Sequence, residues 1–301
     1  MNDNNLTVSL SDPDFSIHVR KILIIGLGLM GGSIAEALSR KGCSVAAIDP
    51  NEASINTALE NGWITEGKTS PDEEFLSEFD LVIFAVYPHA MINWLKLYGK
   101  HLRKDTVITD VTGVKCPYVY EAQDILGDAP EFISAHPMAG RESQGIAFAS
   151  GDIFKGANYI ITPTLRNSDK AISVCNELGR LIGCKKISRV TPEYHDEMIG
   201  FLSQLTHCIA VALMTCRDTE NMAAFSGDSF RELTRIAKIN PDMWSELFIA
   251  NKKALISEIE QFENQLTVIK NAVCDDDINT LKSIMSLSTK RRQSFDRESE
   301  R

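Results

Sequence analysis

A glycine-rich turn between two apolar runs constrains this chain more than any other feature. Residues 21–49 read KILIIGLGLMGGSIAEALSRKGCSVAAID, in which Gly26, Gly28 and Gly31 have the spacing G-x-G-x-x-G. An apolar run precedes the glycines, a helical pattern follows them, and a second apolar run ends at Asp49. This order predicts strand, tight turn, helix and strand, the first unit of a dinucleotide-binding fold.

Each glycine of the motif has a separate physical reason. The turn needs backbone freedom at Gly26, a pyrophosphate approaches the main chain at Gly28, and the helix packs closely on the strand at Gly31. The phosphates are expected at the helix N-terminus, where unpaired N–H groups and the helix dipole favour an anion. The motif alone is compatible with an ordinary glycine turn, whereas its flanking strand, helix and acid favour a dinucleotide.

A carboxylate closes the motif and bears on cofactor choice. Asp49 follows Gly31 by 18 positions, near the offset of about 20 at which an acid accepts hydrogen bonds from ribose hydroxyls. Because a carboxylate repels a 2′-phosphate, Asp49 favours NAD over NADP. The loop after the apolar run 81–86 is expected at the same sheet edge. The residues predicted to hold the cofactor are Gly26, Leu27, Gly28, Leu29, Met30, Gly31, Asp49, Ala85 and Val86.

Composition is that of an ordinary soluble protein with an acidic balance. The 301 residues carry a net charge of −10, which argues against nucleic acid as a partner. No apolar run approaches the roughly 20 residues of a membrane span, and the polar N-terminus lacks a signal-peptide pattern. The seven cysteines form no C-x-x-C motif, as is typical of reduced thiols. We therefore expect a cytoplasmic protein without a membrane partner.

The pattern of apolar runs divides the chain into three parts. Residues 1–19 are a polar N-terminal tail. Strand and helix patterns alternate over residues 20–190, which predicts an α/β dinucleotide-binding domain with a doubly wound, Rossmann-type parallel sheet up to about residue 190. After Thr191 the patterns are helical, which predicts an all-α second domain over residues 191–301 for substrate binding and dimerisation.

The second domain contains long apolar helices. One is expected from Pro192 to about Arg217, and another from Asn240-Pro241 to about Val273. Because such a long helix usually needs partners on more than one side, we expect a homodimer formed through this domain. A monomeric bundle is the alternative.

Three histidines are candidates for chemistry. His136 follows the apolar run 132–135 at the predicted carboxyl edge of the sheet, where an imidazole can accept a proton from an alcohol; a histidine satisfied within a turn is the alternative. His195 and His207 lie on one predicted helix, about 120° apart around its axis, and for each we expect an ordinary interhelical contact. No set of histidines and acids has the spacing of a metal site, so no metal is predicted.

An arginine pair lies in the helical part. Arg231 and Arg235 share a helix face four residues apart, for which a solvated face is the usual explanation. Arg235, however, lies in the mostly apolar segment LTRIA, where a guanidinium is costly without an anion. A carboxylate substrate would provide that anion.

Taken together, these residues resemble the prephenate/arogenate dehydrogenase family of tyrosine biosynthesis. The resemblance extends over about residues 21–262. Its motifs are GLGLMGGSIA from Gly26, DVTGVK from Asp110, HPMAGRESQG from His136, TPEYHDEMIGFLSQLTH from Thr191 and FRELTRIAKINPDMW from Phe230. The resemblance implies NAD-dependent oxidative decarboxylation of prephenate to 4-hydroxyphenylpyruvate, or of arogenate, which differs only in an amino group for a keto group.

The resemblance also implies roles for individual residues. His136 would be the general base at the ring hydroxyl, and Arg235 would bind the ring carboxylate. His207 would contact the substrate side chain, and Glu142 would belong to the polar network guarding the pocket. Trp244 is a further candidate for the pocket wall.

The chain departs from the family at one position. The family usually places serine where this chain has Gly113, and that serine bonds the catalytic histidine and the substrate hydroxyl. Thr112 has the nearest hydroxyl. We expect it either to bridge His136 and the substrate as a catalytic residue, or to cap the following helix while a water molecule takes the serine position.

Two other functions are compatible with the glycine motif. A β-hydroxyacid dehydrogenase has a similar motif and an all-α second domain, but those enzymes rely on a lysine motif in the helical domain that this chain lacks. A non-catalytic NAD-sensing protein would need neither His136 nor Arg235.

Overall fold

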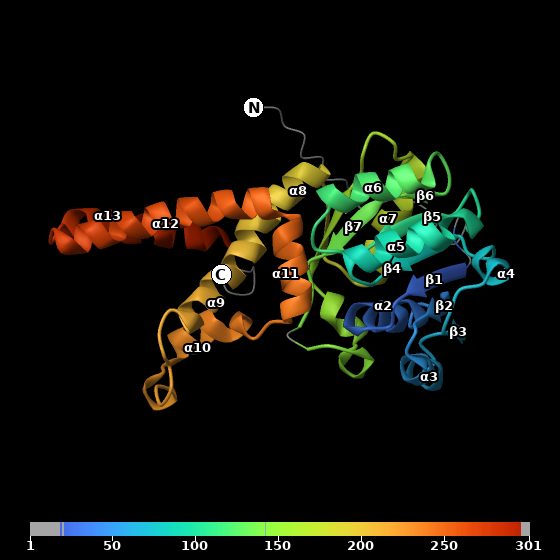
Figure 1. Ribbon diagram of the computed structural model, residues 1–301, viewed down its shortest axis with the longest axis horizontal. Helices are drawn as coiled ribbons and strands as arrows, with labels where there is room; N and C mark the ends of the chain where they lie inside the picture. The colour runs from blue at the N-terminus through green and yellow to red at the C-terminus, as the bar shows by residue number, and fades with distance from the viewer. Residues whose placement is uncertain (1–18, 20, 142, 296–301) are drawn as a thin grey trace. The chain divides into compact units, whose positions relative to one another are not determined.

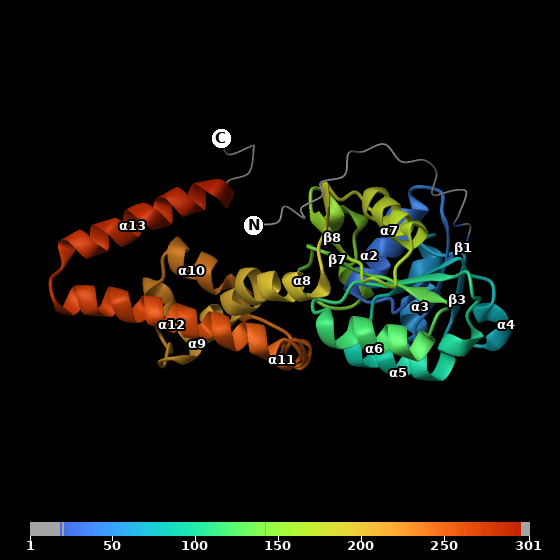
Figure 2. The same ribbon diagram turned by 90° about the horizontal axis from the view of Figure 1, so that it is seen from above.

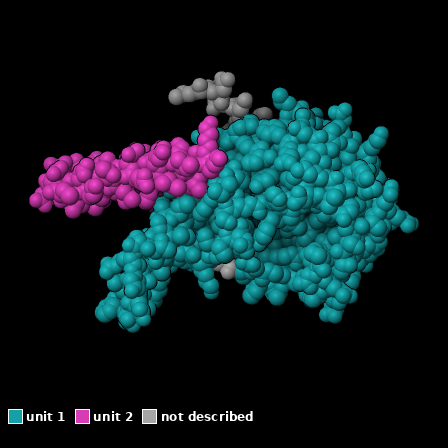
Figure 3. Space-filling model, viewed as in Figure 1, with its two compact units in different colours: residues 1–251 teal, residues 252–301 magenta. Residues whose placement is uncertain are grey.

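The computed structural model describes residues 19, 21–141 and 143–295. Apart from Val19, the predicted polar tail therefore lies outside the described residues. The chain divides into two compact units, residues 1–251 and 252–301, which are coloured separately in Figure 3. The first unit contains the α/β part of the chain together with the helices up to Ala250.

A parallel sheet lies at the core of the α/β part of the first unit (Figure 1). Among the described residues its strand order is β3-β2-β1-β4-β5-β6, with all neighbours parallel. This order confirms the predicted Rossmann-type sheet, in which the direction of winding reverses between β1 and β4. The strands are β1 (Lys21–Ile25), β2 (Ser44–Ile48), β3 (Glu66–Lys68), β4 (Leu81–Phe84), β5 (Val107–Asp110) and β6 (Glu131–Phe132).

Helices cover both faces of this sheet. Ile22 and Ile24 of β1 belong to one apolar cluster, which includes residues of α2 and α7. Leu23 and Ile25 belong to the other, with residues of α5 and α6, because successive strand residues point to opposite faces. Figure 2 shows these helices on either side. The helices are α2 (Leu29–Ser39), α3 (Glu52–Glu60), α4 (Glu73–Leu76), α5 (Pro88–Tyr98), α6 (Cys116–Leu126) and α7 (Asp169–Leu181).

Three later strands form a separate sheet, which corrects the prediction of one sheet up to residue 190. The chain leaves the first sheet at Ile133, whose N–H still bonds Ile108 O at 2.9 Å. Strand β7 (Ser134–Pro137) then pairs antiparallel with β8 (Asn158–Thr162), which pairs parallel with β9 (Lys186–Arg189). Apolar patterning predicts buried strands, but it does not say which sheet a strand joins.

The first predicted long helix is interrupted in the structure. It consists of α8 (Pro192–Ile199), a π-helical segment η4 (Gly200–Leu205) and α9 (Thr206–Thr215). By length and composition, 192–215 is the one described helical stretch that could cross a membrane, and 28% of its most apolar window is buried. A helix is predicted over this stretch but no membrane span, because polar residues interrupt its apolar runs. It carries buried His195 and Asp196, so we assign it to packing within the protein.

The second predicted long helix is divided at Asn251. Its parts are α11 (Pro241–Ala250) in the first unit and α12 (Lys252–Cys274) in the second. Asn251 is buried, and its Nδ2 donates to Asp196 O and to Gln204 Oε1, both at 2.8 Å. The break therefore follows from tertiary hydrogen bonds, which helical periodicity does not reveal.

The remaining helical segments are α13 (Ile278–Arg292) and several short ones. In the second unit, α13 begins after Asp277, whose carboxylate accepts from Thr280 N–H at 3.0 Å. The other described helical segments are α10 (Asp228–Thr234), η1 (Gly99–His101), η2 (Ile146–Phe148), η3 (Gly151–Phe154), η5 (Ala223–Phe225), η6 (Arg235–Ala237) and η7 (Gln293–Phe295).

Candidate active site

The three glycines of the motif have the geometry that a dinucleotide loop requires. Gly26 has φ +94°, a conformation that disfavours side chains. A Cβ at Gly28 would meet no atom within 4 Å, whereas a Cβ at Gly31 would lie 1.8 Å from Gly26 O. The main chain is therefore open at Gly28, beside the N-terminus of α2, and tightly packed at Gly31. These residues fit a bound pyrophosphate.

The loop is held at the ends of β1, β2 and β4. Asp49 Oδ2 accepts from Leu27 N–H at 2.6 Å, and its Oδ1 accepts from Asn51 N–H at 2.8 Å. The carboxylate remains partly exposed, so it can still accept from a ribose. The Leu27 side chain is fully buried, so this residue supports the loop from beneath rather than contacting a ligand through its side chain.

The other predicted cofactor residues surround this loop. Leu29 and Met30 are partly exposed in the first turn of α2, and Ala85 and Val86 are partly exposed after β4. A Cβ at Gly26 would lie 2.6 Å from Val86 Cγ1, so the two loops are in direct contact.

His136 lies on β7, and its nearest polar partner is a second histidine. His136 Nδ1 is 3.0 Å from His195 Nε2, and the ring planes are inclined by 58°. The side chain of His136 is partly exposed. Among the described residues its other ring nitrogen, Nε2, has no hydrogen-bond partner, so this nitrogen is available to a ligand.

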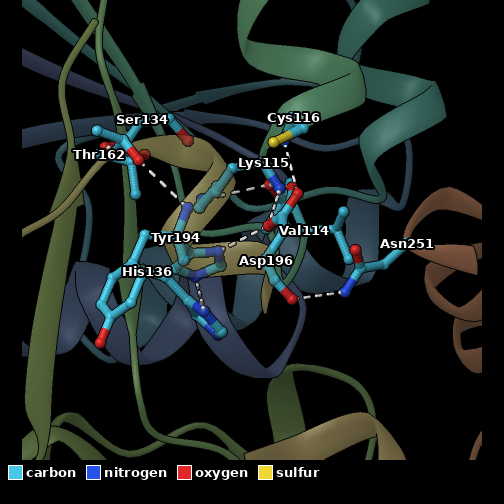
Figure 4. A network of polar contacts seen from close by, with 12 residues as sticks. Val114, Lys115, Cys116, Ser134, His136, Thr162, Tyr194, Asp196 and Asn251 are labelled. Atoms are coloured by element: carbon cyan, nitrogen blue, oxygen red, sulfur yellow. Dashed lines mark hydrogen bonds and ion pairs between the residues drawn. The ribbon is translucent and has the colours of Figure 1, made fainter. Parts of the chain in front are cut away.

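His195 belongs to a buried polar group at the start of α8. Figure 4 shows the neighbouring Asp196 with its partners Lys115, Cys116 and Asn251. The His195 side chain is fully buried, and its Nδ1 is 2.7 Å from Asp196 Oδ1. Asp196 Oδ1 also accepts from Lys115 N–H, and its Oδ2 accepts from Cys116 N–H, both at 2.8 Å. Asp196 thus satisfies the first N–H groups of α6. The expectation of an ordinary interhelical contact for His195 is wrong.

A buried ion pair ties the strand of His136 to the first sheet. Lys115 Nζ donates to Asp110 Oδ2 at 3.0 Å and to Ala135 O at 2.6 Å. Asp110 Oδ1 accepts from Ser134 Oγ and, at 3.3 Å, from Ala135 N–H. These bonds join the end of β5 to the two residues before His136. Asp110 and Lys115 belong to the motif DVTGVK, but no role is predicted for either residue from the sequence.

The surroundings favour neutral histidines. Desolvation lowers the pKa of His136 well below 6.5, and His195 and Lys115 add to this shift. Burial also lowers the pKa of His195, although the bond to Asp196 opposes it. Burial lowers the pKa of Lys115, and Asp110 opposes that shift. A neutral His136 can act as a proton acceptor at neutral pH.

Thr112 does not contact His136. Within the described residues its hydroxyl can donate to the Asp110 carboxylate and to Val114 O at 3.1 Å, and it accepts from Lys115 Nζ at 3.4 Å. The hydroxyl is buried and completes the shell of Asp110. This arrangement does not support a bridge between His136 and a substrate.

Gly113 lies beside the catalytic candidate. A Cβ there would be 4.0 Å from His136 Cε1 and 3.6 Å from Leu247 Cδ1 of α11. Gly113 is not among the described residues with positive φ, so its backbone does not require glycine. The family serine position is therefore next to the His136 ring.

Two of the residues implied to bind substrate lie together. His207 and Trp244 stack with ring centroids 3.7 Å apart and planes inclined by 30°. His207 Nδ1 donates to Ser203 O at 2.9 Å. Helix α11, which carries Trp244, is fixed to the α/β part by Glu246 Oε1, which accepts from His89 N–H at 2.8 Å.

Two predicted site residues remain, Arg235 and Glu142. Arg235 begins η6 and is exposed, which corrects the argument that its guanidinium is costly to accommodate. Glu142 lies outside the described residues. Within the described part of the chain, no group of three or more His, Cys, Asp or Glu residues could hold a metal ion.

Comparison with known proteins identifies two family domains. Residues 34–188 match the nucleotide-binding domain of prephenate dehydrogenase, and residues 191–287 match the prephenate dehydrogenase dimerization domain. A prephenate dehydrogenase of Bacillus subtilis is 27% identical and aligns over 86% of this chain and 72% of its own. A cyclohexadienyl dehydrogenase of Zymomonas mobilis is 28% identical, over 86% of this chain and 90% of its own.

The fold of this chain is also similar to that of a solved prephenate dehydrogenase structure. Prephenate dehydrogenase from A. aeolicus, in complex with hydroxyphenyl propionate and NAD+, has a TM-score of 0.84 and 30% identity to this chain. The match covers 92% of this chain and 99% of that one. The family domains together span most of the sequence, and the chain belongs to the prephenate dehydrogenase family.

Proposed function

We propose that this protein catalyses the NAD-dependent oxidative decarboxylation of prephenate to 4-hydroxyphenylpyruvate in tyrosine biosynthesis. The observation that carries the proposal is the state of His136. Its Nδ1 is engaged by His195 while its Nε2 has no described partner, and its lowered pKa favours the neutral ring. This is the arrangement of a general base. The family membership and the dinucleotide loop support the same reaction.

The chain would supply four functions to the reaction. Gly28 and the N-terminus of α2 would hold the pyrophosphate, and Asp49 would hold the ribose hydroxyls. His136 would accept the proton of the ring hydroxyl. Arg235 would pair with the ring carboxylate, because a guanidinium binds a carboxylate through parallel hydrogen bonds. His207 and Trp244 would contact the side chain of the substrate.

The proposed reaction balances without a further reactant. His136 Nε2 takes the hydroxyl proton. NAD+, when bound, supplies the acceptor for the hydrogen and electron pair that leave the same carbon. The bond to the ring carboxylate breaks, its electron pair enters the ring, and CO2 leaves as the ring becomes aromatic. His136 returns its proton to the phenolate oxygen, so prephenate and NAD+ give 4-hydroxyphenylpyruvate, CO2 and NADH.

We infer a cytoplasmic homodimer that assembles through the helices of residues 191–301. The matched family domain is a dimerization domain. The helical part of the first unit also exposes large apolar side chains that a partner could cover. They include Phe201, Leu202, Phe225, Leu233 and Ile249.

The direct test is the appearance of reduced nicotinamide when the protein is mixed with NAD and one candidate substrate. Prephenate, arogenate and a β-hydroxyacid are compared at equal concentrations. We expect the highest kcat/KM with prephenate. A higher value with arogenate would reassign the substrate within the family, whereas turnover of the β-hydroxyacid alone, or of none, would refute the proposal.

A further inference from the structure

We propose that His195 and Asp196 are positioning residues that hold His136 with its proton on Nδ1 and leave Nε2 as the basic nitrogen. The proposal rests on the proposed role of His136 as general base. It assigns a task to two buried side chains at the start of α8, and that task acts through His136 rather than through contact with substrate.

The hydrogen-bond directions follow from Asp196. Its Oδ1 accepts from Lys115 N–H and its Oδ2 from Cys116 N–H, both at 2.8 Å. A carboxylate held by backbone donors on both oxygens is an acceptor toward its third neighbour. His195 Nδ1, 2.7 Å from Oδ1, therefore carries a hydrogen and donates it.

The same logic passes through His195 to His136. A neutral imidazole with a hydrogen on Nδ1 has a lone pair on Nε2. His195 Nε2 must then accept, and the atom that faces it at 3.0 Å is His136 Nδ1. His136 Nδ1 is thus the donor, and the lone pair of neutral His136 lies on Nε2, the nitrogen without a described partner.

The charged groups around His136 and His195 disfavour protonation of both rings at once. Lys115 lies close enough to lower the pKa of both histidines, and its ammonium is paired with Asp110. The Cys116 thiol beside Asp196 stays neutral because its pKa is raised to about 12. Asp196 is the carboxylate in direct contact with His195.

The hydrogen bond between His136 and His195 is kept when His136 gains a proton. The new hydrogen is on Nε2, and Nδ1–H continues to donate to His195 Nε2. The positive ring then faces a neutral imidazole that is itself bonded to a carboxylate, which stabilises the charge without moving a second proton. Protonation of His195 while His136 keeps its Nδ1 hydrogen would place N–H against N–H and break the contact.

Gly113 explains why this support matters in this chain. The position beside His136 Cε1 carries no side chain, and the nearby hydroxyl of Thr112 bonds Asp110. Among the described residues, His195 is thus the hydrogen-bond partner that fixes the orientation of the His136 ring.

The test compares His195→Leu, which removes the acceptor, with His195→Gln, whose amide oxygen can accept from His136 and whose amide N–H can donate to Asp196. We expect kcat to fall about 10- to 100-fold in His195→Leu and to recover partly in His195→Gln. The NAD dissociation constant should stay within about twofold in both variants, since the side-chain partners of His195 are His136 and Asp196 rather than the dinucleotide loop. His101→Gln, which changes a distant histidine, is the matched control and should keep its kcat.

A readout independent of turnover decides the tautomer. In protein labelled with ¹⁵N-histidine, the ring nitrogens of His136 should report a hydrogen on Nδ1 in the unaltered protein and in His195→Gln. In His195→Leu the hydrogen should shift toward Nε2. If His195→Leu does not fold, the tautomer in the unaltered protein and the kcat of His195→Gln remain as tests.

The outcomes separate this inference from the proposed function. The positioning role would be overturned if the hydrogen of His136 stays on Nδ1 in His195→Leu. It would also be overturned if His195→Leu keeps full kcat while His136→Asn is inactive, and His136 would then remain the base. A lower kcat with an unchanged His136 tautomer would also overturn it, because the effect would then be structural. Full activity of His136→Asn would instead remove the proposed base itself.

Discussion

Asp49 joins the nucleotide loop to the end of β2 by accepting the Leu27 N–H at 2.6 Å. The same carboxylate remains partly exposed. It therefore shapes the loop and offers a negative charge at the place where the ribose of a dinucleotide is expected.

Cofactor preference tests this dual role. We expect kcat/KM to be at least about tenfold higher with NAD than with NADP, because the carboxylate repels a 2′-phosphate. Asp49→Asn keeps an oxygen for Leu27 N–H and removes the charge, so it should narrow the ratio. Equal kcat/KM for the two cofactors in the unaltered protein would contradict the role of Asp49.

Thr112→Val tests the structural role that its contacts indicate. The substitution keeps the shape and removes a hydroxyl bonded to buried Asp110, so unfolding should become easier by about 1–3 kcal/mol. We expect kcat to change by less than about twofold, and Thr112→Ser to restore stability. A loss of kcat without a loss of stability would return Thr112 to the catalytic hypothesis.

Arg235→Gln tests the proposed carboxylate contact. Loss of a charge-assisted hydrogen bond of about 1.5–3 kcal/mol should raise KM for the substrate roughly 10- to 100-fold. Arg231→Gln is the matched control, because Arg231 is also exposed on the preceding helix and bonds Ser226. Similar KM values for the two variants would indicate that Arg235 lies on a solvent-exposed helix face and does not bind the substrate.

The pH dependence of kcat/KM follows from the lowered pKa of His136, because kcat/KM reports the ionisation of the ligand-free enzyme. The neutral ring is the base, so activity is present above its pKa and is lost as the pH falls through it. Because burial lowers that pKa well below 6.5, kcat/KM should stay level as the pH is lowered to 6.5 and decline only in more acidic solution. An acidic limb centred at or above 6.5 would contradict the assignment.

The parts of the fold that depend on local backbone chemistry are predictable from the sequence. The motif predicts positive φ at Gly26, an open main chain at Gly28 and close packing at Gly31, and the structure has all three. Asp49 is likewise where the strand–turn–helix–strand order places it.

The parts that depend on distant segments are not predictable in this way. His195 lies 59 positions from His136, and helical spacing gives its angle around α8 but not the strand that it faces. The break at Asn251 depends on bonds to Asp196 and Gln204, and the change of sheet at Ile133 on the pairing of β7 with β8. The adjacent pair His195-Asp196 in the motif TPEYHD was the available signal.

The role of His136 as the general base is tested most directly by one variant. His136→Asn is assayed for prephenate-dependent reduction of NAD, with the NAD dissociation constant measured on the same preparation. We predict that kcat falls by about 10²- to 10⁴-fold, the usual contribution of a general base, while NAD affinity stays within about twofold. Unchanged kcat, or loss of NAD binding in place of kcat, would contradict the account.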